Sequence, residues 1–201
     1  TLRVNPDVDA RTHAKISTGK KENKFGVPID TASAIYGRLS ALEGLHLRGV
    51  ALHIGSQLLT LDPLEEAFTR IGALVEELRG AGHDVTHVDL GGGLGVQYRE
   101  GENPPTPEEY GAMVHRVTGN WGVTLMFEPG RVICANAGVM VSEVIRVKAG
   151  AINPFVIVDA AMNDLARPAM YDAWHGVAAV RPTGERMVAN VVGPVCETSD
   201  T

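Results

Sequence analysis

The chain has 201 residues, of which 44% are hydrophobic and 21% are charged. This composition is typical of a soluble globular protein, and the length suffices for one domain and the start of another. No apolar run approaches the roughly 20 residues needed to cross a bilayer, and the net charge of −6 disfavours a nucleic-acid-binding surface. Two cysteines, Cys134 and Cys196, are too few for a disulfide framework. We therefore expect reduced thiols in a cytoplasmic protein, with Cys134 packed in the core.

The first part of the chain alternates short apolar runs with helical patterns, which is typical of β/α units around a parallel sheet. One helix is expected from near Asp30 to Gly44. A second begins at Asp62-Pro63, where Asp is a good N-cap and Pro suits the first turn, and ends at Gly80. A third begins at the capping box of Thr106 and Glu109. The expected strands lie near residues 1–5, 47–54, 85–90 and 123–127.

Four such passages amount to half of a (β/α)8 barrel, which we place in residues 1–135. No comparable helical pattern follows the fourth strand. Residues 136–201 then change character, because short alternating runs dominate and helical faces are scarce. Strands are expected at 139–148, 155–159 and 187–192, with a helical or irregular stretch near 161–175. The predicted fold class is α/β: half of a TIM-like barrel, followed by the start of a β-rich domain.

Three glycines, Gly91, Gly92 and Gly93, directly follow the third expected strand. Without side chains, their backbone N–H groups can approach an anion closely and adopt positive φ. In (β/α)8 barrels a phosphate site commonly lies after two successive late strands. The alternative is a tight strand-to-helix turn that needs glycine only for packing.

The fourth expected strand ends in Glu128-Pro129-Gly130-Arg131. Glu128 therefore lies at the carboxyl end of a strand, where the chemistry of barrel enzymes collects. Arg131 can bind a phosphate or carboxylate in a bidentate fork. The alternative is a surface ion pair, worth about 0–1 kcal/mol.

Three further groups of residues carry possible chemistry. His53 sits where the second expected strand meets its loop and Ser56 follows in that loop, although a lone His on an apolar strand is more often structural. Arg167 and Tyr171 are four residues apart, so a helical turn places both on one face; alone, they are more simply explained by packing. The last group is the Cys196-Glu197 pair near the end of the chain.

Together these motifs resemble the alanine-racemase-like (fold type III) pyridoxal-phosphate decarboxylases, and the resemblance runs over nearly all of the chain. It implies the C-terminal half of a (β/α)8 barrel, pyridoxal 5'-phosphate as the cofactor and no metal. His53 would stack on the pyridine ring, and Glu128 would face the ring nitrogen. The implied cofactor-binding residues are His53, Ser56, Gly91, Gly92, Gly93, Glu128, Gly130 and Arg131.

The resemblance also implies an amino-acid substrate, meso-2,6-diaminopimelate, which loses CO2 to give L-lysine. The substrate's distal carboxylate would be held by Arg131, Arg167 and Tyr171. Its distal ammonium would be held by Glu197, and Cys196 would serve as the proton donor. Cys196 and Glu197 would reach the partner's active site in a homodimer, with no membrane or nucleic-acid partner.

One expected family feature has no counterpart, because no segment resembles the strand that carries the Schiff-base lysine. Lys20, Lys21 and Lys24 lie in a loop too polar to lower the pKa of a catalytic lysine. We therefore expect a chain truncated at both ends and inactive alone. The exposed edges of its first and last barrel strands favour self-association.

Three alternatives stay open. A related decarboxylase of ornithine, arginine or carboxynorspermidine would share the cofactor motifs, although Glu197 with Arg167 and Tyr171 favours diaminopimelate. A non-catalytic pyridoxal-phosphate-binding homologue would lack the lysine for a functional reason. A phosphate-binding barrel of unrelated chemistry would leave the match at Cys196 and Glu197 as coincidence.

Overall fold

The computed structural model describes residues 1–10, 18–19 and 23–200 of the chain. These residues form two compact units. The first comprises Thr1–Gln97 and Asn103–Ala137, and the second comprises Tyr98–Glu102 and Gly138 onwards. The short segment 98–102 therefore leaves the first unit between two of its elements and packs in the second.

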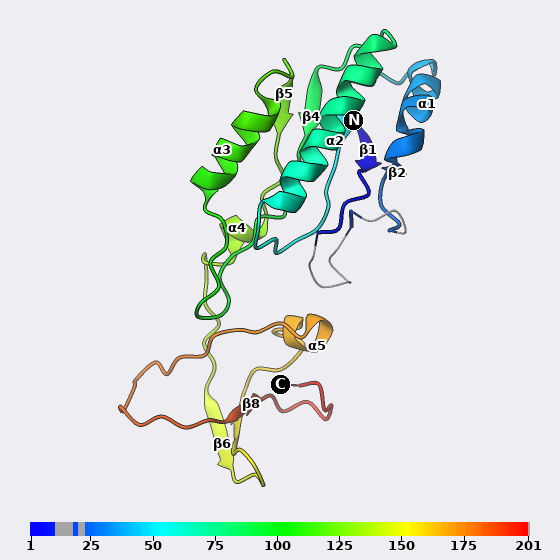
Figure 1. Ribbon diagram of the computed structural model, residues 1–201. Helices are drawn as coiled ribbons and strands as arrows, with labels where there is room; N and C mark the ends of the chain where they lie inside the picture. The colour runs from blue at the N-terminus through cyan, green and yellow to red at the C-terminus, as the bar shows by residue number, and fades with distance from the viewer. Residues whose placement is uncertain (11–17, 20–22, 201) are drawn as a thin grey trace. The chain divides into compact units, whose positions relative to one another are not determined.

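The first unit is built on a parallel sheet of five strands in the order β2-β1-β3-β4-β5 (Figure 1). Four of them confirm the expected strands, with shorter bounds. The strand β2 was not expected, because two residues carry no periodic signal. It pairs with the end of β1, so β2 and β5 form the edges of the sheet. The strands are β1 (Leu2–Asn5), β2 (Val27–Pro28), β3 (Gly49–Ala51), β4 (His87–Asp89) and β5 (Thr124–Met126).

The three expected helices are present in the first unit. They are α1 (Ile29–Ser40), α2 (Asp62–Gly80) and α3 (Pro107–Thr118), and a single turn, α4 (Arg131–Cys134), follows β5. The capping box of α3 is complete: the Thr106 hydroxyl accepts from the Glu109 N–H, and the Glu109 carboxylate accepts from the Thr106 N–H. Asp62 is the first residue of α2 rather than its N-cap, and there its charge complements the helix dipole.

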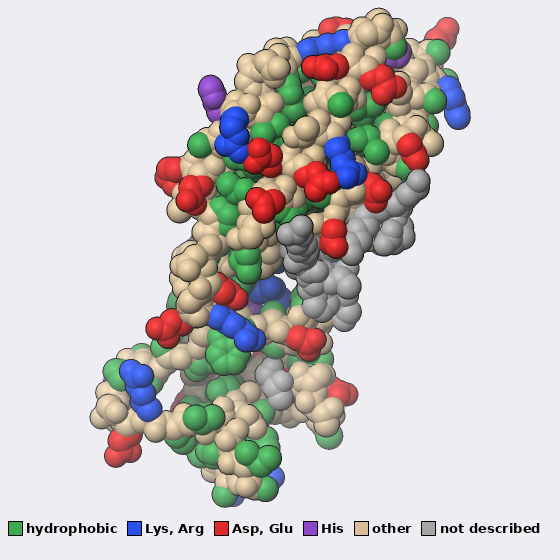
Figure 2. Space-filling view, viewed as in Figure 1, with side chains coloured by type: hydrophobic (Ala, Val, Ile, Leu, Met, Phe, Trp, Pro, Cys, Tyr) green, Lys and Arg blue, Asp and Glu red, His purple; other side chains and the backbone are tan. Residues whose placement is uncertain are grey.

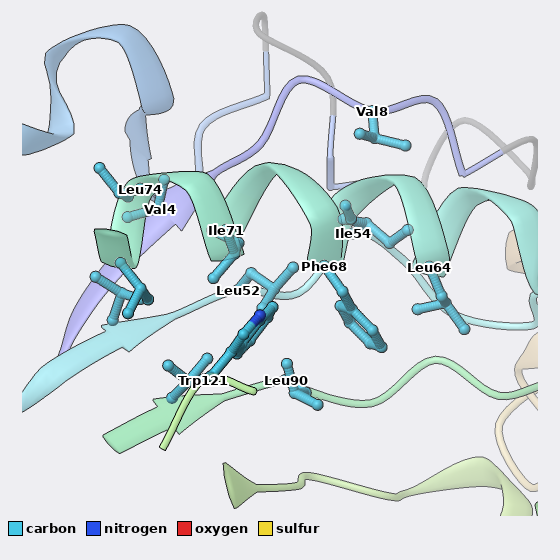
Figure 3. Close-up of a cluster of buried hydrophobic side chains, with 14 of the residues drawn as sticks. Val4, Val8, Leu52, Ile54, Leu64, Phe68, Ile71, Leu74, Leu90 and Trp121 are labelled. Carbon is cyan, nitrogen blue, oxygen red and sulfur yellow. The ribbon is translucent and has the colours of Figure 1, made fainter. Parts of the chain in front are cut away.

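Alternation along the strands explains which face of the sheet is covered. Val50 is in register with Val88, and Val88 with Leu125, so these side chains point to the same face. Val50 and Val88 are fully buried in a core with Phe68, from the apolar side of α2. Figure 3 shows Phe68, Ile71, Leu52, Leu90 and Trp121 gathered between α2 and the sheet. On the face seen in Figure 2, acidic and basic side chains are scattered among hydrophobic and other groups.

The opposite face of the sheet presents a different row of residues. Arg3, Ala51, Asp89 and Met126 are in register across β1, β3, β4 and β5. Because these residues alternate with the buried valines, they point away from the helices. Arg3 and Met126 are exposed. This face carries the polar groups of the candidate site.

The second unit contains a three-stranded sheet and one short helix. Strand β7 (Phe155–Val158) pairs antiparallel with β6 (Val144–Lys148) and parallel with β8 (Asn190–Val192). The helix α5 (Arg167–Tyr171) falls in the stretch expected to be helical or irregular. The strand expected from residue 139 begins only at Val144. Just before it, the Ser142 hydroxyl and the Glu143 N–H donate to the carboxylate of Asp159. The strand expected at 187–192 is likewise confined to its last residues.

One expectation about packing is wrong. Cys134 is exposed rather than buried in the core. It lies in the single turn α4, which follows the edge strand β5 and has no buried residue. A helix of one turn has no continuous face to bury. Among the helices of the described residues, none is both long and apolar enough to span a membrane.

Exposed apolar surface leads to a prediction about assembly. The edge strand β6 of the second sheet exposes more than half of Val144, Ile145 and Val147, and β5 is an open edge of the first sheet. Unpaired edges and apolar patches promote association. We expect the 201-residue chain to form dimers or larger species in light scattering. The variant Val147→Lys should associate less, and a monodisperse monomer at micromolar concentration would contradict the prediction.

Candidate active site

The sequence motifs follow three neighbouring parallel strands, β3, β4 and β5, at their carboxyl ends. We call this end of the first sheet its carboxyl edge. The backbone ladder continues beyond the strands: Leu52 N–H donates to Asp89 O, and Leu90 N–H donates to Met126 O. Glu128 N–H donates to Gly91 O at 2.8 Å. Because the strands are parallel and in register, His53, the glycine loop and Glu128 follow at the same end of the sheet. The expected juxtaposition of these motifs in the first unit is therefore present.

The glycine loop is shaped by steric demands that only glycine meets. Gly91 and Gly93 have positive φ values of 67° and 122°. A Cβ atom at Gly92 would clash with the backbone carbonyl of Glu128. The loop is thus a tight turn that brings β4 and β5 together, as the packing alternative required. It also leaves backbone uncovered by side chains, which is the property that an anion site uses.

Two backbone N–H groups of this loop already donate hydrogen bonds to side chains. Gly91 N–H donates to Asp89 Oδ1 at 2.8 Å, and Gly92 N–H donates to His53 Nδ1 at 3.2 Å. The glycine loop is consequently held by the two strands beside it. An anion at this edge therefore needs further hydrogen-bond donors, and Ser56 and Arg131 can supply them.

Ser56 and Arg131 form such a donor pair. The Arg131 guanidinium donates to the Ser56 hydroxyl oxygen from both Nε, at 3.2 Å, and Nη2, at 3.1 Å. Both side chains are half-buried. Ser56 follows β3 and Arg131 begins α4, so 75 residues of sequence separate them. A guanidinium beside a hydroxyl is a common arrangement for binding phosphate or carboxylate.

The protonation state of His53 follows from its surroundings. Nδ1 accepts a hydrogen bond from Gly92, so the neutral ring carries its proton on Nε2. Burial lowers the pKa of His53 below its ordinary value, and the charge of Arg3 lowers it further. The carboxylates of Glu128 and Asp89 oppose this shift. His53 is therefore a neutral imidazole at neutral pH and feels the charge of exposed Glu128.

The lowered pKa of His53 predicts a dependence of stability on pH. The unfolded chain binds a proton at His53 near pH 6.5, whereas the folded chain binds it only at lower pH. Stability is therefore complete above pH 6.5 and falls as the pH drops from there towards the folded pKa. We expect the chain to lose more unfolding free energy between pH 7.5 and 5.5 than His53→Asn, which keeps an acceptor but cannot titrate. Equal losses in urea titrations would contradict the assignment.

The glycine loop forms part of the wall of an apolar pocket of about 190 Å³. Its lining is shared by the glycine loop, the start of α3 and the turn after β5. Tyr110 packs edge-on against Phe127, with ring centroids 6.3 Å apart. Burial raises the pKa of Tyr110 to about 12, so its hydroxyl stays protonated. The lining residues are Gly91, Gly92, Gly93, Leu94, Pro107, Tyr110, Phe127, Pro129, Gly130 and Val132.

The second unit holds the remaining candidate residues. Arg167 and Tyr171 begin and end α5, and both are half-buried. The Arg167 guanidinium bonds to the Tyr98 hydroxyl and to His175 Nε2. The sequence motifs did not indicate Tyr98 and His175. Tyr98 is 69 residues from Arg167 in the sequence, and His175 is 8 residues away but outside the helix α5.

Cys196 and Glu197 lie in an exposed loop after β8. The loop is folded around the carboxylate of Asp200, which is only 4% exposed. This carboxylate accepts from Met162 N–H at 2.5 Å and from Val195 N–H at 2.8 Å. A carboxylate that satisfies two backbone N–H groups from different segments fixes the loop to residues 160–162. The sequence motifs did not indicate Asp200 as this anchor.

The anchoring role of Asp200 gives a stability prediction. Asn at this position can accept through one oxygen only, and its amide would face an N–H donor. Leaving a buried donor unsatisfied costs about 1–3 kcal/mol. We expect Asp200→Asn to reduce the unfolding free energy by that amount in urea titrations. Asp164→Asn is the matched control, since that exposed carboxylate accepts from the single N–H of Ala161; an equal effect of the two changes would contradict the anchor.

The candidate residues thus fall into two sets. The first unit brings together His53, Ser56, Gly91, Gly92, Gly93, Glu128, Gly130 and Arg131. The second unit holds Arg167, Tyr171, Cys196 and Glu197. Lys20 and Lys21 lie outside the described residues, and the Lys24 ammonium lies 4.9 Å from the ring centroid of Phe25. Within the described part of the chain, no cluster of three metal-ligating side chains occurs.

Comparisons with known proteins agree with this arrangement. Residues 1–135 match the family model described as the pyridoxal binding domain of pyridoxal-dependent decarboxylases. Diaminopimelate decarboxylase of Zymomonas mobilis is 51% identical over 99% of this chain and 48% of its own length. The Pseudomonas aeruginosa protein of the same name is 52% identical over the whole chain and 48% of its length.

Solved structures give the same result for the fold. The crystal structure of diaminopimelate decarboxylase from Helicobacter pylori, complexed with L-lysine, superposes with a TM-score of 0.92 at 40% identity. The match covers 98% of this chain and 49% of that one. The chain spans about half the length of the curated relatives it matches. The α/β fold with a mostly parallel sheet and a separate small sheet is therefore that of this group, and the chain belongs to the pyridoxal-dependent decarboxylase family.

Proposed function

We propose that this chain is part of a longer polypeptide that decarboxylates meso-2,6-diaminopimelate to L-lysine and CO2 with pyridoxal 5'-phosphate. The observation that carries the proposal is the edge where β3, β4 and β5 bring His53, the glycine loop, Glu128 and Arg131 together. The chain is 51% and 52% identical, over nearly its whole length, to two proteins named diaminopimelate decarboxylase, and this identity supports the proposed substrate. The longer polypeptide is called the full-length polypeptide below, and we place its Schiff-base lysine outside these 201 residues.

The residues at this edge fit the cofactor. The phosphate requires cationic and hydroxyl donors, and Arg131 with Ser56 supplies both. The side-chain-free backbone of Gly92 and Gly130 permits close approach. When bound, the pyridoxal ring supplies an electron sink for the negative charge left by loss of CO2. A carboxylate at Glu128 would keep the ring nitrogen protonated and thereby strengthen that sink.

His53 contributes as a neutral aromatic surface. Its ring is half-buried and fixed by the hydrogen bond from Gly92. A neutral imidazole can stack on a pyridine ring without adding positive charge beside the ring nitrogen. The lowered pKa of His53 keeps that condition near neutral pH. Protonation at acidic pH would remove the acceptor for Gly92 and loosen the glycine loop.

The second unit supplies groups for substrate selection. We assign the carboxylate that remains in the product to Arg167 and Tyr171, together with Arg131. The distal ammonium is assigned to Glu197, and delivery of a proton to the reacting carbon is assigned to Cys196. Both Cys196 and Glu197 are exposed, which suits a role at the active site of a partner subunit. We therefore propose a homodimer that acts in the cytoplasm and closes its barrel with the rest of the polypeptide.

A related activity is the second candidate. Lysine decarboxylase from Selenomonas ruminantium superposes with a TM-score of 0.77 at 26% identity. Its name shows that decarboxylation of another basic amino acid occurs on this fold. The discriminating groups are Arg167 and Tyr171, because lysine and diaminopimelate both carry a distal ammonium for Glu197, whereas only diaminopimelate also carries a distal carboxylate for a clamp.

The test is turnover by the full-length polypeptide after loading with pyridoxal 5'-phosphate. CO2 and L-lysine should appear in equal amounts from meso-diaminopimelate. The Arg167→Ala variant should retain the cofactor absorbance but lose turnover. Absence of CO2 release from the loaded wild-type polypeptide would overturn the proposal, and the 201-residue chain should be inactive under the same conditions.

A further inference from the structure

Arg167 is held by two neutral side chains. Its Nη1 donates to the Tyr98 hydroxyl at 3.0 Å and to His175 Nε2 at 3.2 Å. Its guanidinium carbon lies 5.0 Å from the centroid of the Tyr98 ring. The rings of Tyr98 and His175 meet edge to face at 5.5 Å. Three half-buried side chains thus form one cluster in the second unit, which we call the Arg167 cluster.

The direction of these bonds fixes the charge of the cluster. A guanidinium can only donate, so His175 must accept through Nε2 and carry its proton on Nδ1. The Tyr98 hydroxyl oxygen accepts as well, and neither partner is a carboxylate. Within the described residues, Arg167 makes no ion pair with a carboxylate, and its Nε and Nη2 make no hydrogen bond. The cluster therefore orients a full positive charge without neutralising it.

Tyr98 reaches this cluster from a segment that is itself anchored. Residues 98–102 lie between β4 and α3 in sequence but pack in the second unit. The Glu102 carboxylate accepts from the backbone N–H groups of Tyr98 and Arg99 at 2.9 and 3.1 Å. These bonds lower the pKa of Glu102, so the carboxylate is ionised at neutral pH. The Arg99 guanidinium lies 5.2 Å from the Trp174 ring centroid, which adds a second contact to the segment before His175.

We propose that Tyr98 and His175 are positioning residues that aim Arg167 at the carboxylate of an amino-acid ligand. This inference rests on the proposed function, in which Arg167 binds the carboxylate retained in the product. An arginine has several rotatable bonds, and fixing it before binding lowers the entropy lost when the ligand arrives. One nitrogen is used for positioning, which leaves Nε and Nη2 as an open fork for two carboxylate oxygens.

The experiment compares two ligands that differ only in the group that Arg167 would bind. L-Lysine carries the retained carboxylate, whereas 1,5-diaminopentane has the same chain and amines without it. Dissociation constants are measured by calorimetry on the loaded full-length polypeptide. We expect Tyr98→Phe and His175→Leu each to weaken L-lysine binding about tenfold. Binding of 1,5-diaminopentane should change less than about twofold, because only the clamp is affected.

Two further variants separate positioning from folding. His175→Gln places an amide oxygen near the position of Nε2 and should restore L-lysine binding to within about threefold of wild type. Arg99→Gln removes the neighbouring contact with Trp174 and leaves both bonds of Arg167 in place, so it should bind both ligands as wild type does. Melting temperatures of all variants are recorded alongside.

The outcomes distinguish this inference from the proposed function. If Arg167→Ala abolishes L-lysine binding while Tyr98→Phe and His175→Leu bind normally, the positioning role is wrong and the proposed function stands. Equal weakening of both ligands by Tyr98→Phe or His175→Leu would show a general structural role and also overturn the inference. If the wild-type polypeptide turns over diaminopimelate but Arg167→Ala binds L-lysine normally, the assignment of Arg167 fails, and the inference fails with it. If the wild type neither binds L-lysine nor releases CO2 from diaminopimelate, the proposed function fails together with the inference.

Discussion

Replacing Gly92 with alanine should lower turnover of the full-length polypeptide by about 100-fold or more. A Cβ atom at this position meets the backbone carbonyl of Glu128, which cannot rotate away as a side chain could. Either the glycine loop or the Glu128 turn must therefore move. Displacements of about 1 Å at groups that orient a substrate are enough to cost this factor. The same movement should weaken binding of pyridoxal 5'-phosphate, which a fluorescence titration would measure.

Gly111→Ala is the matched control for this prediction. Gly111 lies in α3, and an added Cβ there meets no atom within 4 Å. Alanine is a better helix former than glycine, so the control should keep full activity and gain about 0.5–1 kcal/mol of stability. Normal turnover and cofactor affinity in Gly92→Ala would show that the loop tolerates a side chain. The close approach of backbone at this edge would then have no functional importance.

Replacing Phe68 with alanine should reduce the unfolding free energy by about 3–5 kcal/mol. Phe68 is completely buried, and Figure 3 shows its ring on the side of α2 that faces Leu52 and Leu90. It also packs against Tyr110 of α3 at 6.4 Å between ring centroids. Truncation removes the contact that ties α2 to both the sheet and α3. Few domains have stability to spare on this scale.

The control for Phe68 is Leu42→Ala, because Leu42 is 52% exposed and lies after α1. Surface changes of this type usually stay within about 0.5 kcal/mol. Denaturant midpoints of the two variants and the wild type provide the comparison. A loss of less than about 1 kcal/mol for Phe68→Ala would mean that the core relaxes around the cavity and that this packing is not central.

The elements of the first unit were predictable where local chemistry and periodicity agree. The capping box at Thr106 marked the start of α3, and Asp62-Pro63 and Gly80 marked the start and the end of α2. The strand β2 was not predictable, because its pairing with β1 depends on contacts across more than 20 residues of sequence rather than on its own pattern. Cys134 was expected in the core and is exposed, because α4 is a single turn after an edge strand and has no buried residue.

The candidate site shows the same division. His53, the glycine loop and Glu128 were found because each follows a recognisable strand, and parallel pairing then brings them together. Their roles in binding the cofactor stay predictions. Tyr98 was missed because 69 residues of sequence separate it from Arg167, and His175 was missed because it lies after the end of α5. Side-chain contacts between distant segments leave no periodic mark on a single sequence.

The most direct test of the account is a comparison of three substrates by the loaded full-length polypeptide. Initial rates of CO2 release would be measured with meso-diaminopimelate, ornithine and arginine at equal concentrations. We expect turnover of diaminopimelate alone, with L-lysine as the amine product. Faster release from ornithine or arginine would contradict the substrate assigned through Glu197 and Arg167 while leaving the fold and cofactor in place.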